Sequence, residues 1–108
     1  TGTGGIAADK YITRTYRSGD SNGPDGSTLT FPITTYTGGV AHTSSSILVM
    51  LNGVVQIGGT AAQVNPAVGV AATANYYVDS NGANVVFGSA SGDAPLSADV
   101  VHIIELPI

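Results

Sequence analysis

The chain has 108 residues and no cysteine, so it fits about one domain without disulfides or Cys-based zinc sites. Only 9% of its residues are charged, against about 25% in typical soluble domains. The net charge is −4 and all three cations lie within the first 17 residues. Nucleic-acid binding, which needs many cations to neutralise phosphates, is therefore not expected.

Membrane insertion is not expected either. The longest strongly apolar run, Ile47–Leu51, is far shorter than the roughly 20 residues of a membrane-spanning helix. No basic segment followed by an apolar one opens the chain, so no secretory leader is expected. The sequence begins at Thr1, which fits both removal of an initiator Met and a fragment of a longer protein.

Small residues and turn residues divide the chain into about seven strand candidates. Residues 1–9 are rich in Gly and predict a flexible arm, followed by a single β domain over residues 10–108. Pro32 either ends its strand or places it at a sheet edge, because it lacks a backbone donor. The predicted strands are 10–17, 28–33, 47–51, 54–57, 76–78, 85–87 and 100–106.

Two hairpins give the clearest local signals. Asn52-Gly53 separates two apolar runs and is typical of a type I′ turn, which needs positive φ at both central positions. Asp79–Gly82 is the turn of a second hairpin. Gly58–Asn75, which contains Pro66, is predicted to be an extended loop. These features indicate an all-β fold, a single small sandwich or barrel of about seven short antiparallel strands.

No catalytic residue is expected. His42 and His102 are the only histidines, and both are interpreted as ordinary packed or solvent-facing residues, with pH sensing at His102 as the alternative. The segment Gly88–Gly92 resembles a nucleophile elbow, but Ala90 stands in the place of the nucleophile. A small hydrolase would require one of the histidines to lie beside a Ser in a cleft.

No cofactor or metal is expected. Gly2–Ala7 formally matches the dinucleotide fingerprint, but no strand precedes it. Asp20–Gly26 resembles a calcium loop, yet Pro24 occupies a ligand position and no Glu closes the loop. Turn chemistry is the favoured interpretation of both Asp20–Gly26 and Asp79–Gly82, and a bound cation is the alternative for the first.

Glycoside hydrolysis and sugar binding have weak support. The acids that would have to pair across a cleft lie mostly in predicted turns, and no Trp is present to form a sugar platform. The five tyrosines are interpreted as half-buried strand residues whose hydroxyls reach water, with glycan contact as the alternative. The acids are Asp79, Asp93, Asp99 and Glu105, and the tyrosines are Tyr11, Tyr16, Tyr36, Tyr76 and Tyr77.

The low charge indicates a permanent assembly, because charged side chains normally protect strand edges from pairing. The alternative is a monomer with a surface rich in Ser and Thr. Segment 100–106 is the candidate edge, since its apolar residues lie on both faces; a central core strand is the alternative. The candidate subunit interface is Val101, Ile103, Ile104 and Leu106.

The order of signals from Phe31 onward resembles a small β module of tailed-phage structural proteins, found in tail fibres, tail appendages and small virion-surface proteins. The resemblance covers about two thirds of the chain, and Gly58–Ala74 departs from it because a short turn is expected there. The segments that carry it are Ile47–Gln56, Tyr76–Val78, Val85–Phe87, the loop with Pro95, and Asp99–Ile104.

The resemblance implies an architectural role on the virion surface and supplies no catalytic residues. A chain of this length has no room for a fibre shaft, which favours a capsid decoration or cement-type protein. The implied partners are other virion proteins, either the major capsid protein or tail proteins, and further copies of the chain in a homo-oligomer. A trimer is expected by family analogy alone. The alternative is a tail fibre or appendage module that binds a host receptor or glycan.

Overall fold

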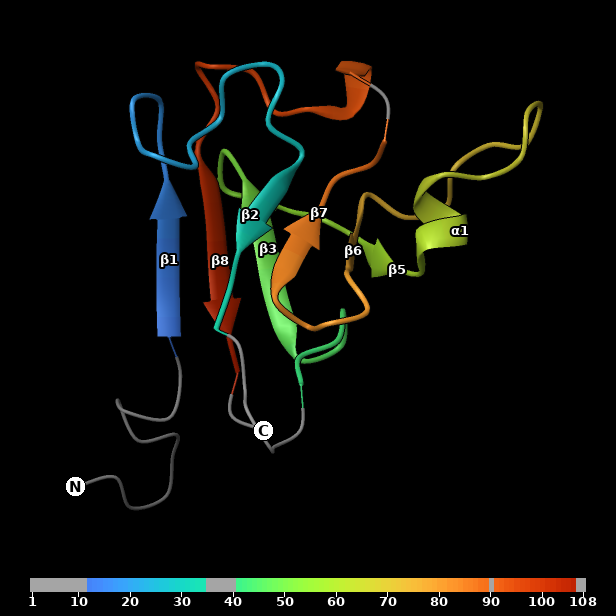
Figure 1. Cartoon of the computed structure of the whole chain (residues 1–108), viewed down its shortest axis with the longest axis horizontal. Coiled ribbons are helices and arrows are strands. Elements are labelled where there is room, and N and C mark those ends of the chain that lie inside the picture. The colour runs from blue at the N-terminus through green and yellow to red at the C-terminus, as the bar shows by residue number, and fades with distance from the viewer. Residues whose placement is uncertain (1–11, 35–40, 90, 107–108) are drawn as a thin grey trace.

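The chain folds into two four-stranded β-sheets packed together as a sandwich (Figure 1). The computed structural model describes residues 12–34, 41–89 and 91–106, and it contains eight strands within them. The predicted all-β class is thus confirmed. The predicted arm at residues 1–9 lies outside the described residues.

The first sheet, sheet A, consists of antiparallel strands. Its order is β1 (Ile12–Tyr16), β8 (Val101–Glu105), β3 (Ile47–Leu51) and β4 (Val54–Val55). Asn52 and Gly53 connect β3 to β4 with φ angles of 53° and 83°. Positive φ at both positions is what a type I′ turn requires, so the predicted hairpin is confirmed.

The second sheet, sheet B, contains one parallel pair. Its order is β2 (Thr30–Pro32), β7 (Asn84–Val86), β6 (Tyr76–Val78) and β5 (Gly58–Gly59). The parallel strand β5 was not predicted, and the expectation of antiparallel strands throughout is wrong there. A Cβ on Gly58 would lie 2.6 Å from the Tyr76 ring. Gly58 therefore allows a close approach of strand to ring at a position where β-propensity gives no signal.

The predicted extended loop over residues 58–75 is also wrong at α1 (Ala61–Val64). Thr60 caps this helix, accepting a hydrogen bond from the backbone N–H of Gln63, whose side chain accepts one from Thr60 N–H. This reciprocal capping box stabilises a helix of only four residues. The helix ends before Pro66, which is why that proline does not prevent it. A 3₁₀ helix, η2 (Ser91–Asp93), lies in the loop before β8.

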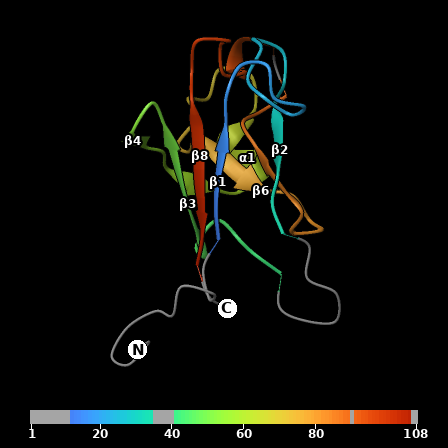
Figure 2. The same cartoon turned by 90° about the vertical axis from the view of Figure 1, so that its left-hand side faces the viewer.

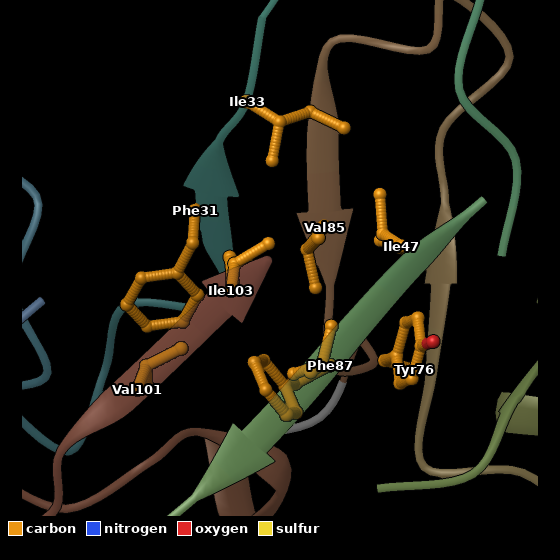
Figure 3. Packing of buried hydrophobic residues seen from close by; sticks show 9 residues of the cluster. Phe31, Ile33, Ile47, Tyr76, Val85, Phe87, Val101 and Ile103 are labelled. Atoms are coloured by element: carbon orange, nitrogen blue, oxygen red, sulfur yellow. The ribbon is translucent and has the colours of Figure 1, made fainter. Parts of the chain in front are cut away.

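The core between the sheets is apolar and aromatic (Figure 3). Phe31 packs against Phe87 at 5.6 Å between ring centroids in an edge-to-face arrangement, and against Tyr16 at 5.4 Å. Each fully buried aliphatic or aromatic side chain contributes about 1.5–3 kcal/mol through removal from water. The buried cluster is Phe31, Ile33, Ile47, Val49, Tyr76, Val85, Phe87, Val101 and Ile103.

The expectation that segment 100–106 forms a sheet edge is wrong. Strand β8 lies between β1 and β3 and forms a ladder with each. Val101 and Ile103 have no exposed surface, because they face the core, and they leave nothing for a partner to contact. Ile104 is half-buried on the opposite face, and Leu106 follows the strand with 36% of its surface exposed. Subunit contact through these two residues stays a prediction.

Candidate functional site

The side of sheet A that faces away from the core is mostly apolar. Successive residues of a strand point to opposite faces, so the neighbours of Val49, Val101 and Ile103 point outward. Ladder register places the outward residues of all four strands beside one another. We call this surface the outer face; it consists of Thr13, Thr15, Leu48, Met50, Val55, His102 and Ile104.

The outer face has no Asp, Glu, Lys or Arg among its seven residues. Leu48 is 38% exposed and Val55 57% exposed, and Met50 and Ile104 are half-buried. The His102 ring Nδ1 lies 2.9 Å from the Thr15 hydroxyl, which ties β8 to β1 on this side. Figure 2 looks toward sheet A, with β6 and α1 behind it. The arrangement suits contact with another apolar protein surface.

A buried carboxylate lies on the inner side of the same sheet. Glu105, only 1% exposed, accepts a hydrogen bond from the Arg14 guanidinium and one of 3.2 Å from the backbone N–H of Thr34. Arg14 also donates to the Thr34 hydroxyl at 2.8 Å. Burial raises the pKa of Glu105, but the hydrogen bonds from Arg14 and Thr34 outweigh it and hold that pKa below the usual value. These hydrogen bonds connect β1 and β8 of sheet A to Thr34, in the segment that follows β2.

His42 joins this buried group from the segment before β3. Its Nε2 lies 3.5 Å from Glu105 Oε1, and its Nδ1 lies 2.6 Å from the Ser46 hydroxyl. Burial lowers the pKa of His42, and the nearby Glu105 only partly opposes this. The interpretation of His42 as a packed residue is confirmed, since it is 2% exposed.

The Ser46–His42–Glu105 arrangement has the residue types of a catalytic triad, but its surroundings do not suit catalysis. The Ser46 hydroxyl accepts a hydrogen bond from Thr43 N–H and donates to Thr43 C=O within a tight turn. The His42 side chain has no exposed surface, so a substrate cannot reach the ring. A His thus lies beside a Ser, but the ring is enclosed rather than open to a cleft.

A hollow of about 520 Å³ lies between the segment 41–44, α1 and the β6–β7 turn. Tyr77, Thr60 and Ser80 contribute to its lining. Asp79 also lines it, but its carboxylate accepts hydrogen bonds from Ala83 and Asn84 and so maintains the turn. Of the four acids considered for hydrolysis, Asp79 alone lines this hollow, and Asp93 alone lines a second one of about 220 Å³. Neither hollow contains a pair of them.

Turn chemistry accounts for the acidic loop at residues 20–26. The Asp25 carboxylate accepts hydrogen bonds from Ser27 N–H and Thr28 N–H, which lower its pKa. The Asp20 carboxylate accepts one from Arg17 N–H. Within the described residues no group of three His, Asp or Glu side chains converges as a metal site would require. The dinucleotide-like segment at residues 2–7 and Ala90 of the elbow-like string fall outside the described residues.

Two tyrosine hydroxyls donate hydrogen bonds to backbone carbonyls. Tyr16 donates to the Pro32 carbonyl, and Tyr76 donates to the Ser44 carbonyl at 3.2 Å. The expectation of a half-buried ring is confirmed for Tyr16 and is wrong for Tyr76, which is 2% exposed. Tyr77 lines the hollow, and Tyr11 and Tyr36 lie outside the described residues.

Of the outer face, the sequence interpretation named only Ile104 as a candidate interface residue, and it missed the buried ionic group. Strands β3 (ILVML) and β8 (VHIIE) carry apolar residues at successive positions, and this lack of alternation signals an apolar surface on both sides of the sheet. Nothing in the sequence pairs Arg14 with Glu105, because 91 positions separate them.

Among the described residues no helix is long and apolar enough to cross a membrane. Comparisons with protein-family models, curated proteins and solved structures return no match to this chain. Any function assigned to it therefore depends on its own residues.

Proposed function

We propose that this chain is a non-enzymatic structural module of a phage particle that acts by contact with other proteins. The observation that supports this most directly is the uncharged outer face of sheet A. Two exposed aliphatic residues, Leu48 and Val55, and the half-buried Met50 and Ile104 lie there, on a chain with few charges to keep surfaces apart. The resemblance to small β modules of tailed phages supports the virion as the setting, and the form we propose is a capsid decoration or cement-type protein.

A second candidate is a tail fibre or appendage module that binds a host receptor or glycan. The hollow beside Tyr77 favours it, because an aromatic ring with nearby hydroxyls from Thr60 and Ser80 suits a sugar. The carboxylate there is already bonded within the turn. We therefore rank this candidate second.

Copy number in purified virions distinguishes the two. The chain is quantified against the major capsid protein by mass spectrometry. A count comparable with the capsid protein supports decoration, and a few copies per particle supports a tail location. Absence from the particle contradicts the proposal as a whole.

A fluorophosphonate probe tests the non-enzymatic part of the proposal. Such probes label serines that an adjacent His activates. We expect no labelling of Ser46, because His42 is enclosed and the hydroxyl is held in its turn. The control is a Ser46→Ala variant, which sets the background. Labelling of Ser46 that is lost in that variant would overturn the assignment.

A further inference from the structure

We propose that Asn52 is a site of spontaneous deamidation in the folded chain and that its hydrogen bonds to the segment before β8 set the rate. The inference is independent of the proposed structural role. The chain contains three Asn-Gly pairs, which begin at Asn22, Asn52 and Asn81, and all three asparagines are exposed. Asparagine is thermolabile, and a following glycine favours the reaction because it has no side chain to hinder the attack of its nitrogen. Exposure alone does not distinguish the three pairs, so the difference has to come from their contacts.

The reaction needs only the Asn-Gly pair and water. The backbone nitrogen of the glycine attacks the asparagine Cγ, the new N–Cγ bond closes a five-membered succinimide ring, and the Cγ–Nδ2 bond breaks. The side-chain amide leaves as ammonia, with the proton that the glycine nitrogen loses. Water then opens the ring at either carbonyl and leaves aspartate or isoaspartate. The glycine N–H therefore has to be free of an acceptor, and the asparagine side chain has to be able to turn toward it.

The fold prevents the first condition at two of the three pairs. Gly23 N–H donates to the Asp20 carbonyl at 3.0 Å, and Gly82 N–H donates to the Asp79 carbonyl at 2.9 Å. Both glycines are buried, and a Cβ added to either would overlap a neighbouring atom. Closing the succinimide ring at these pairs therefore requires a closely packed turn to open first.

Gly53 differs from the other two glycines. It is exposed in the turn between β3 and β4, and a Cβ added to it would have no atom within 4 Å apart from its chain neighbours. Within the described residues its N–H donates no hydrogen bond. The nitrogen that has to attack is thus open to solvent at this pair.

The Asn52 side chain, in contrast, is held at both ends of its amide. Its Nδ2 donates to Asp99 Oδ1 at 2.8 Å, and its Oδ1 accepts from Val100 N–H at 2.8 Å. Leu96 N–H holds the Asp99 carboxylate in place at 2.8 Å. Cγ cannot turn toward Gly53 N until these contacts open. Because they lie at the surface, they open more readily than a closely packed turn, so Asn52 should react faster than the other two asparagines.

The product removes the contact that held the side chain. A carboxylate at position 52 has no donor for Asp99, and the two carboxylates repel each other. The hairpin then loses its side-chain bond to Asp99. It also gains a negative charge beside Val54 and Val55, which are 64% and 57% exposed. Deamidation would thus alter both the attachment and the charge of this edge of sheet A.

Peptide mapping by mass spectrometry, on the full chain incubated under mildly alkaline conditions, tests the proposal. The rate at each Asn-Gly pair in the folded protein is divided by the rate at the same pair in concentrated urea, where the fold protects none of them. We expect this ratio to be about tenfold larger at Asn52 than at Asn22 and Asn81. An equal or larger ratio at either of the other two asparagines overturns the assignment.

An Asp99→Ala variant tests whether the hydrogen bonds set the rate. It should raise the rate at Asn52 by about tenfold, as loss of a hydrogen bond to a charged group allows, and leave Asn22 and Asn81 unchanged. The matched control is Ser97→Ala, at an exposed position in the same segment, which should leave all three rates unchanged. Asp99→Glu, which displaces the carboxylate, serves if the Ala variant does not fold. An unchanged rate at Asn52 in the folded Asp99 variant overturns the proposed role of the hydrogen bonds.

Discussion

The two sheets differ in how far the apolar residues on their outward sides are exposed to solvent. On sheet B, Val86 points away from the core side of its strand but is only 7% exposed, and the nearby helix α1 packs against β6. On sheet A, Leu48 in the corresponding kind of position is 38% exposed. The chain therefore covers outward apolar surface on one sheet and leaves it open on the other. The proposed contact with other proteins therefore concerns sheet A rather than sheet B.

The edge strands of the two sheets also differ, in how well they are protected from pairing with another strand. Both edge strands of sheet B are protected: β2 contains Pro32, and β5 has two glycines. In sheet A, β4 is equally short, but β1 is a five-residue strand without Pro. Short strands and Pro are common means of preventing edge pairing. Sheet A thus combines the open face with the one long edge among the described strands.

Removing the largest shared core side chain should have the greatest effect. Phe31 belongs to sheet B and contacts Tyr16 of sheet A. Phe31→Ala should lower the free energy of unfolding by about 4 kcal/mol, from lost burial and the cavity left behind. Urea unfolding should show both sheets melting in one transition. Phe31→Leu, which fills more of the space, serves if the Ala variant does not fold, and Thr30→Ala is the exposed control; two separate transitions would refute a shared core.

Breaking the ion pair between Arg14 and Glu105 should have the second-largest effect on the free energy of unfolding. Arg14→Met leaves the Glu105 carboxylate buried without its cation and should cost about 3 kcal/mol, the low end of the range because the Arg14 side chain is 33% exposed. The double variant Arg14→Met/Glu105→Leu removes both charges and should recover most of that loss. Urea unfolding of the wild type, Arg14→Met, Glu105→Leu and the double variant completes a double-mutant cycle. A double variant no more stable than Arg14→Met would show that the pair is not the source of the effect.

A matched lysine substitution tests the contrast between the outward sides directly. Val86→Lys places an ammonium group at a buried position. It should lower the free energy of unfolding by about 2 kcal/mol, even if the aliphatic part of the lysine side chain lets the ammonium reach the surface. Leu48→Lys, on the open face, should change the free energy of unfolding by less than about 0.5 kcal/mol. Both are measured at a concentration where the chain is a monomer. Equal losses would mean that the two sheets are covered to the same degree.

Local signals in the sequence predicted the strands but not their order. Two hairpins were predictable from their turns. Asn52-Gly53 tolerates the positive φ angles that its turn requires. Asp79 accepts a hydrogen bond from the backbone of its own turn. The position of β8 between β1 and β3 depends on pairing between residues 50 or more positions apart, which the turn residues do not report. Strand β5 escaped prediction because it consists of two glycines, Gly58 packed closely against Tyr76 and Gly59 against Gln63 and Ala74, and glycine gives no β-propensity signal. Seven of the eight strands were therefore predictable, whereas the ionic group and the outer face required the fold.

Mild acid should have the smallest effect on the free energy of unfolding, and this effect should come from the protonation of His42. Burial lowers the native pKa of His42 below its ordinary value of 6.5. As pH falls through 6.5, the unfolded chain binds a proton that the native ring resists, so the free energy of unfolding decreases. The decrease ends at the native pKa and cannot exceed about 1.4 kcal/mol per pH unit for one proton. Glu105 acts in a separate window: its native pKa is lowered, so its contribution is lost only below its ordinary value of 4.5.

Urea unfolding between pH 5 and pH 7 isolates the His42 effect. His42→Asn keeps an amide group near the Ser46 hydroxyl but does not titrate, so this variant should lose most of the slope. His102→Asn, at the other histidine and on the open outer face, should retain it. The reverse result would move the proton-linked step from the buried group to the outer face of sheet A. Acid would then act on the outer face rather than on the junction between the sheets.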